Sequence, residues 1–232
     1  MRHLKSSRSI TPSVALLLGL IALLALLALG LLARTAEVTH HDLRLDEVAQ
    51  QIRFPLATGL FVGLTDAASE IAGIAALMAG AVALIARRRR WDAVRLVAMA
   101  GAGWTIALGV KTVIARPRPP ASLWAITPDA SGSFPSGHDT TACVVILVAL
   151  LAFTGTGRAR MWATGAAIVF AAAVGASRVY LGDHYPTDVV GSWLAVAAGA
   201  LLVWGAGELT PVREAAGRLL RDRHLRAVVE TR

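Results

Sequence analysis

A run of about 20 residues without a charged side chain, residues 14–33, constrains the fold of this chain more than any other feature. An α-helix of that length crosses the roughly 30 Å hydrocarbon core of a bilayer. The run is longer than the roughly 7–15 apolar residues of a secretory signal peptide, although Ala33-Arg34-Thr35-Ala36 has the form of a cleavage site. We therefore interpret it as an uncleaved first membrane span.

Composition agrees with a membrane protein. Hydrophobic residues form 56% of the chain and charged residues 16%, whereas soluble domains carry about 25% charged residues. Five further apolar segments follow the first, and several reach membrane length only if flanking residues extend each helix. We predict an all-α, polytopic membrane protein with a bundle of six transmembrane helices in residues 14–206. The predicted spans are residues 14–33, 67–86, 94–114, 140–153, 161–176 and 189–206.

Basic residues indicate which ends of these helices face the cytoplasm. They gather before the first segment, at residues 87–90, between the fourth and fifth segments, and after the sixth. If the six helices alternate in direction, these positions share one side, which the positive-inside rule assigns to the cytoplasm. We predict a cytoplasmic N-terminus (1–13) and a basic cytoplasmic tail (207–232) in the plasma membrane. The formal charge of +8 therefore reflects topology, and we expect no nucleic-acid partner.

Residues 34–66 mix charged and apolar side chains. We interpret them as an outer amphipathic stretch, of which a helix lying along the membrane interface is one form. His40-His41-Asp42 lacks partner ligands at a recognisable spacing, so we expect a solvated loop there rather than a metal site.

His184 and Asp188 are the first candidate catalytic pair. They are four residues apart, and Pro186 between them suits the first turn of a helix, so both side chains lie on one helix face. A carboxylate bonded to one imidazole nitrogen fixes the tautomer and leaves the other nitrogen free to attack phosphorus. A core hydrogen bond that only tethers two helices would have the same spacing.

A second cluster, Ser136-Gly137-His138, has the form of a helix start. Ser136 is a good N-cap, Gly137 allows close approach of backbone to an anion, and a helix N-terminus favours phosphate. His138 would lie at the mouth of the same site as a general acid. Asp139 and Asp183 stand beside the two histidines, and we expect both to be solvated neighbours.

Three basic residues complete the pattern: Lys111, Arg118 and Arg178. Guanidinium groups bind phosphate oxygens in pairs, and three cations with a helix terminus can offset a phosphate dianion and the charge that develops during its transfer. An interfacial anchor whose ammonium reaches the headgroups is the alternative for Lys111. In the predicted topology all three clusters lie on the non-cytoplasmic face.

Taken in order, the clusters read KTVIARPRP, PSGH and SRVYLGDHYPTD. This combination resembles the type 2 phosphatidic acid phosphatase superfamily over roughly residues 65–203. The resemblance implies His184 as nucleophile, Asp188 as its partner and His138 as the acid for the leaving oxygen. It also implies a set of phosphate binders: Lys111, Arg118, Ser136, Gly137 and Arg178. Arg116-Pro117 repeats Arg118-Pro119, and only the spacing from Lys111 selects Arg118.

The resemblance further implies phosphate hydrolysis without a metal or other cofactor. We therefore expect an integral-membrane lipid phosphatase whose site faces the periplasm or exterior and whose partner is a lipid phosphate in the bilayer. Undecaprenyl diphosphate, phosphatidylglycerol phosphate and phosphatidic acid are the types of substrate expected, with phosphohistidine as intermediate. A lipid phosphotransferase and a non-enzymatic transporter of phosphorylated lipid or anion are the alternatives.

Overall fold

The computed structural model describes residues 10–128, 131–153 and 157–209. Within these ranges the chain forms eight α-helices and one short 3-10 helix, without a β-strand. The elements are α1 (Pro12–Leu32), α2 (Ala36–Gln51), α3 (Pro55–Asp66), α4 (Glu70–Ala86), α5 (Arg90–Ile114), η1 (Ala121–Leu123), α6 (Gly137–Ala152), α7 (Gly157–Leu181) and α8 (Pro186–Gly207).

Local sequence signals start several of these helices. The side-chain oxygens of Thr11, Thr35, Ser69 and Ser136 each accept a hydrogen bond from the backbone N–H three residues further on. These bonds satisfy N–H groups that lack a partner in the first turn of a helix. Pro186 begins α8, where its missing N–H is not needed.

Four helices, α1, α5, α7 and α8, are long and apolar enough to cross a membrane. Helices α3 and α4 pass the same test only as a pair, with a bend of 51° between them, and α6 is an apolar helix of 16 residues. The prediction of an all-α, polytopic membrane protein is therefore confirmed. Each predicted apolar segment overlaps one of these helices, whereas the count of six spans stays a prediction.

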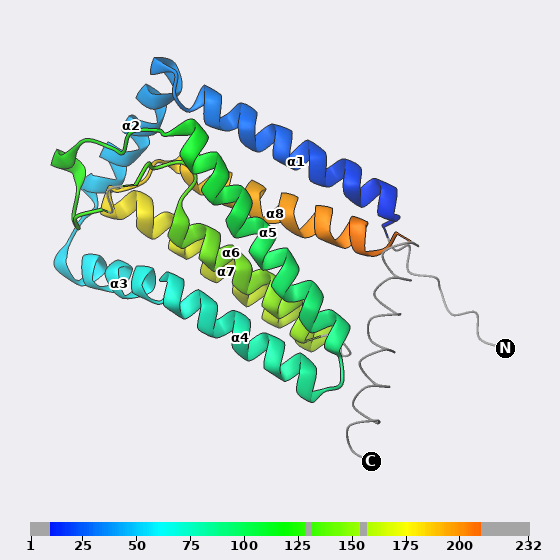
Figure 1. Cartoon of the computed structure of the whole chain (residues 1–232). Helices are drawn as coiled ribbons and strands as arrows, with labels where there is room; N and C mark the ends of the chain where they lie inside the picture. The colour runs from blue at the N-terminus through cyan, green and yellow to red at the C-terminus, as the bar shows by residue number, and fades with distance from the viewer. Residues whose placement is uncertain (1–9, 129–130, 154–156, 210–232) are drawn as a thin grey trace, which may run out of the picture.

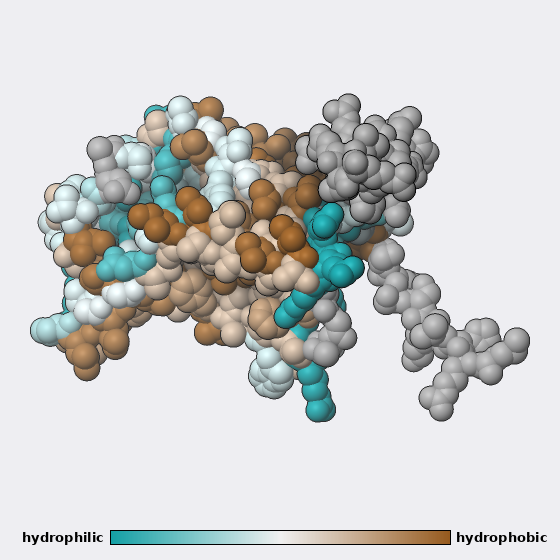
Figure 2. All heavy atoms as spheres, turned by 60° about the horizontal axis from the view of Figure 1, so that its bottom comes forward, coloured by the Kyte–Doolittle hydropathy of each residue, from teal (hydrophilic) through white to brown (hydrophobic). Residues whose placement is uncertain are grey.

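The surface matches a bilayer environment. Large apolar side chains such as Leu24, Val82, Leu108 and Val169 are exposed on the outside of the helices. On the face drawn in Figure 2, apolar residues occupy the middle of the molecule and hydrophilic residues gather toward its two ends. Exposed leucine and valine in a continuous band are expected where lipid replaces water.

The long helices lie side by side, with α1 and α5 packed on α8 and with α7 packed on α6 (Figure 1). At one end, on the left in Figure 1, α2 lies near the α5–α6 connection and the α7–α8 turn. The α4–α5 turn lies at the opposite end. The three clusters of candidate site residues therefore share one end of the bundle, as the alternating topology predicts.

Helices α5 and α8 cross at a pair of glycines, Gly103 and Gly199. A Cβ atom added to Gly199 would lie 2.5 Å from the backbone nitrogen of Gly103 and 2.9 Å from its Cα. Small residues allow this close approach of two helix backbones inside a membrane.

At the opposite end, two residues of the arginine run bind the end of α6. Arg87 Nη1 donates to the carbonyl oxygen of Ala152 at 2.6 Å, and Arg89 Nη1 donates to that of Leu151 at 2.9 Å. The last carbonyl groups of a helix have no partner within the helix, so these cations satisfy them. The basic stretch at residues 87–90 therefore stabilises the bundle in addition to its predicted place on the cytoplasmic side.

Residues 34–66 form helices α2 and α3, in agreement with the helical form of the predicted amphipathic stretch. Asp42, however, is buried rather than solvated. Asp42 and Asp46 are four residues apart and share the face of α2 that is buried in the protein. The expectation of a solvated loop at His40-His41-Asp42 is therefore wrong, because Asp42 forms an ion pair with Arg116.

Candidate active site

A tight turn between α7 and α8 places His184. Gly182 has a φ of +79°, in the left-handed region, and a side chain there would overlap the carbonyl oxygen of Leu123. Asp188 lies in the first turn of α8, where its Oδ2 accepts a hydrogen bond from the backbone N–H of Tyr185 at 2.9 Å. The turn and this cap fix the residues on either side of His184.

His184 is 2% exposed and both of its ring nitrogens have partners. Nδ1 lies 3.3 Å from Asp188 Oδ2, and Nε2 lies 3.1 Å from Arg118 Nη1. A guanidinium can only donate hydrogen bonds, so Nε2 must accept one, and the proton of the neutral ring is therefore on Nδ1. Nε2 is then the unprotonated nitrogen, and its electron pair accepts the hydrogen bond from Arg118.

Burial is the main reason why the pKa of His184 is lowered to about 3. The positive charges of Arg118 and Arg178 lower it as well, and Asp188 opposes them. The imidazole is therefore neutral near pH 7, as a nucleophile must be.

Asp183 holds two of the predicted phosphate-binding cations. Its Oδ2 pairs closely with Arg178 and lies 3.7 Å from Arg118 Nη1. The expectation that Asp183 and Asp139 are solvated neighbours is wrong, because both residues are fully buried. The turn at Gly182 directs Asp183 inward, and Asp139 lies in the first turn of α6 with its carboxylate against Gly175 of α7.

Backbone contacts join the second cluster to the third. The N–H of Ser136 donates to the carbonyl oxygen of Asp188 at 3.2 Å, and Ser192 Oγ donates to the carbonyl oxygen of Ser136 at 2.8 Å. Gly137 and His138 follow in the first turn of α6, where both are half-buried. The start of α6 is therefore fixed beside the start of α8.

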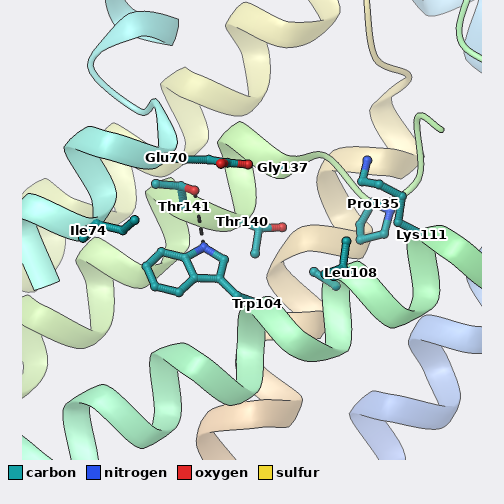
Figure 3. Close-up of a pocket in the computed structure, with 10 residues that line it drawn as sticks. Glu70, Ile74, Trp104, Leu108, Lys111, Pro135, Gly137, Thr140 and Thr141 are labelled. Atoms are coloured by element: carbon teal, nitrogen blue, oxygen red, sulfur yellow. Dashed lines mark hydrogen bonds between the residues drawn. The ribbon is translucent and has the colours of Figure 1, made fainter. Parts of the chain in front are cut away.

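Lys111 lies at the end of α5 between two openings. Its Nζ donates to the carbonyl oxygen of Gly132 at 2.7 Å. A cavity of about 250 Å³ lies between α4, α5 and α6, and Trp104, Leu108 and Lys111 form its α5 side. In Figure 3, Lys111 and Pro135 stand at one end of this cavity, and the Trp104 indole donates a hydrogen bond to Thr141.

A larger hollow of about 710 Å³ shares Leu108 and Lys111 with the first cavity. Arg118, Trp124 and Ser131 also line it. Lys111 thus borders a mainly apolar cavity inside the bundle and a second hollow that has Arg116, Arg118 and Ser131 among its lining residues. Arg118, which contacts His184, lines only the second.

Sequence comparison identifies the family. The pattern of the PAP2 superfamily matches residues 91–209. The chain belongs to the PAP2 superfamily. It is 38% identical to decaprenylphosphoryl-5-phosphoribose phosphatase of Mycobacterium tuberculosis over 130 residues, which cover 53% of this chain and 65% of that protein. It is 28% identical to phosphatidylglycerophosphatase B of Bacillus subtilis over 173 residues, 72% of this chain and 83% of that protein.

The fold agrees with this PAP2 membership. The crystal structure of a transmembrane PAP2-type phosphatidylglycerolphosphate phosphatase from Bacillus subtilis has a TM-score of 0.73 and 27% sequence identity to this chain. The match covers 82% of this chain and 96% of that structure. The resemblance drawn from the three motifs is therefore confirmed at the level of family and fold.

Sequence reasoning missed one part of this PAP2 site. Arg116 was set aside as a repeat of Arg118, yet it is 2% exposed and its Nη1 donates to Asp188 Oδ1 at 2.7 Å. The repeated Arg-Pro pair was the only signal, and spacing from Lys111 cannot show that the first arginine points inward. Among the described residues, no group of three His, Cys, Asp or Glu side chains is placed to hold a metal ion.

Proposed function

We propose that this protein is an integral-membrane phosphatase that hydrolyses a lipid phosphate or diphosphate through a phosphohistidine on His184, without a metal ion. The observation that carries the proposal is the pair of contacts to His184. Asp188 accepts the Nδ1 proton, and an Arg118 N–H points to Nε2. A phosphoryl oxygen that takes this N–H of Arg118 from Nε2 would free the electron pair of Nε2 and bring phosphorus next to it.

The reaction has two displacements. In the first, Nε2 of His184 forms a bond to phosphorus while the bond to the leaving oxygen breaks, and His138 gives that oxygen a proton. In the second, His138 takes a proton from water, the water oxygen bonds to phosphorus, and the bond from phosphorus to Nε2 breaks. Inorganic phosphate leaves and neutral His184 is restored.

Positive groups would stabilise the transferring phosphoryl group. Arg118 and Arg178 are held by Asp183, and Lys111 and the N-terminus of α6 would complete the set. Arginine donors suit the planar array of equatorial oxygens, and a helix N-terminus offers free N–H groups. These groups are fixed before substrate binds, which is what electrostatic stabilisation of a transition state requires.

The cavity beside Lys111 supports a lipid substrate. Its walls include Ile74, Trp104 and Leu108, and it lies between helices rather than in an aqueous loop. A substrate of the undecaprenyl diphosphate, phosphatidylglycerol phosphate or phosphatidic acid type would place the start of its chain there. The relatives are named decaprenylphosphoryl-5-phosphoribose phosphatase and phosphatidylglycerophosphatase B, and both names support a substrate with a lipid chain but differ in the headgroup.

We also propose that six spans cross the plasma membrane, with the short α6 as one of them, and that the site faces the periplasm or exterior. Both described chain ends would then be cytoplasmic. Single cysteines at Gly132 and Arg89, in a chain whose Cys143 is replaced by Ser, test this with an impermeant thiol reagent. Labelling of residue 132 alone from outside is expected, and labelling of both from one side would contradict the topology.

Phosphate release by purified protein in detergent, with a chelator present, tests the activity. Isoprenoid diphosphates, glycerophospholipid phosphates and soluble phosphate esters form the substrate panel. His184→Ala is expected to abolish release and also an acid-labile phosphoenzyme that wild type forms with ³²P-labelled substrate. Full activity of this variant would disprove the nucleophile. Product appearing on an added alcohol would indicate a phosphotransferase, and absence of any cleavage would favour a transporter.

A further inference from the structure

A buried guanidinium connects the candidate catalytic carboxylate to helix α2. Arg116 Nη1 donates to Asp188 Oδ1 at 2.7 Å, and Arg116 Nη2 donates to Asp42 Oδ2 at 2.7 Å. The side chains of all three residues are at most 4% exposed. Charges with so little access to water need fixed partners, and Arg116 supplies one to each carboxylate.

Two neighbours of Asp188 on its N-terminal side hold the guanidinium in place. Thr187 Oγ1 accepts a hydrogen bond from Arg116 Nη1 and donates one to Asp42 Oδ2, which closes a ring of hydrogen bonds. The Arg116 guanidinium also lies over the ring of Tyr185, with 3.9 Å from Cζ to the ring centroid. The orientation of Arg116 is therefore fixed by its charge partners and by packing.

Helix α2 is itself tied to the end of α7. Gln50 Nε2 donates to the carbonyl oxygen of Val179 at 3.3 Å, and Arg53 Nε donates to that of Tyr180 at 2.9 Å. Arg53 also donates to the carbonyl oxygen of Leu123 at 2.6 Å. Asp42 thus stands on a helix held at its far end by bonds to two other segments. Asp42 lies outside residues 91–209, the region that matches the PAP2 superfamily.

We propose that Arg116 and Asp42 are positioning residues that hold Asp188 in the orientation in which it fixes the ring of His184. The inference rests on the proposed role of His184 as nucleophile. Arg116 occupies Oδ1 of Asp188, which leaves Oδ2 for the Nδ1 proton of His184 and the N–H of Tyr185. Without Arg116 the carboxylate can rotate, and its buried charge has no guanidinium beside it.

The two residues act on His184 with opposite charge. Loss of Arg116 removes the positive charge beside Asp188, so a proton on His184 compensates that carboxylate better and the pKa of the imidazole rises. Loss of Asp42 removes a negative charge and leaves Arg116 beside Asp188, so it does not raise this pKa. The other charged groups facing this network are Arg118, Arg178, Asp183 and Asp46, and the variants below leave all four unchanged.

The test uses full-length Arg116→Met, Arg116→Lys, Asp42→Ala and Asp42→Asn, with kcat and KM on a lipid phosphate that wild type cleaves. Arg116→Met is expected to lose about tenfold to hundredfold in kcat, the range of one charge-assisted hydrogen bond. Arg116→Lys keeps the positive charge but loses the two-pronged guanidinium, so its kcat is expected to fall while His184 stays unprotonated at acidic pH. Asp42→Asn is expected to recover part of the kcat that Asp42→Ala loses.

A second readout needs no turnover. The ¹⁵N chemical shifts of the His184 imidazole, assigned by comparison with His184→Ala, report its protonation between about pH 5 and pH 8. In wild type and both Asp42 variants these shifts are expected to stay those of a neutral ring, whereas in Arg116→Met they move toward those of the protonated ring at the acidic end of this range. This profile distinguishes a positioning role from a merely structural one.

Arg95→Met is the matched control, because it breaks the Arg95–Glu208 ion pair at the other end of the bundle. An equal loss of kcat in Arg95→Met and Arg116→Met would overturn the inference. So would an Arg116→Met protein with wild-type kcat and an acid-insensitive His184. If Arg116→Met does not fold, the kcat values of Arg116→Lys and Asp42→Ala decide the inference, and wild-type kcat in both variants would overturn it. If wild type cleaves no lipid phosphate, the function fails, and the His184 profile still decides on Arg116.

Discussion

Replacement of Gly199 by alanine tests how closely α5 and α8 must pack. The added Cβ would lie 2.5 Å from the backbone nitrogen of Gly103 and 2.9 Å from the carbonyl carbon of Ala102, whereas ordinary contact begins at 3.4 Å. Backbone atoms cannot rotate away as a side chain can, so the helices must separate by about 1 Å. Such overpacking costs about 1–3 kcal/mol.

Gly101→Ala is the matched control, because Gly101 lies in the partner helix α5 and nothing lies within 4 Å of its added Cβ. Both substitutions gain the same helix propensity, about 0.5–1 kcal/mol, so it cancels in the comparison. Gly199→Ala is therefore expected to be about 1–3 kcal/mol less stable than Gly101→Ala. Each kcal/mol of this difference should lower its Tm by roughly 2–4 °C relative to the control. Thermal unfolding in one detergent measures this, and equal Tm values would refute the packing argument.

Three further substitutions follow from buried charges and helix ends. Burial, and to a smaller extent the nearby carboxylates, raises the pKa of Asp46 from 3.8 to about 8. Between these two pH values the folded chain holds a proton that the unfolded chain has lost, so the free energy of unfolding falls as pH rises from 3.8 to about 8. The Tm advantage of Asp46→Asn over wild type should grow from about pH 5 to pH 8, and parallel curves would contradict this. Asp183→Asn removes the negative charge between Arg118 and Arg178, so inorganic phosphate should bind more tightly as an inhibitor. The kcat should fall about tenfold, because Asp183 no longer holds the two arginines. An unchanged inhibition constant for phosphate would refute this account of Asp183. Arg87→Met removes the bond to Ala152 and should cost about 1–2 kcal/mol without changing KM, as phosphate release and thermal unfolding can show.

Much of the fold could be predicted from the sequence because apolar length is a strong physical signal in a membrane protein. Each of the six predicted apolar segments overlaps a helix of the structure, and the basic stretch at residues 87–90 lies at the end of the bundle opposite the α7–α8 turn that carries His184 (Figure 1). Helices α2 and α3 were less evident. Their mixture of polar and apolar residues suits an interfacial segment as well as a helix packed over other polar groups.

The candidate site was predictable in its linear motifs and less so in its charge pairs. Spacing put His184 and Asp188 on one helix face, and the structure brings Arg118 to the same imidazole. The partners of Arg116 could not be foreseen, because Asp42 lies 74 residues away from it in the chain and no spacing rule joins them. Their roles in catalysis remain predictions for the experiments above.

The position of Lys111 between a cavity and a hollow has a consequence for the fate of the products. Hydrolysis of a lipid phosphate separates a molecule that dissolves in oil from an ion that dissolves in water. Here a mainly apolar cavity and a larger hollow that Arg118 and Ser131 border meet at Lys111. If the proposed hydrolysis takes place beside Lys111, the dephosphorylated lipid and the phosphate ion would have separate spaces to enter, and neither would have to cross a medium that repels it.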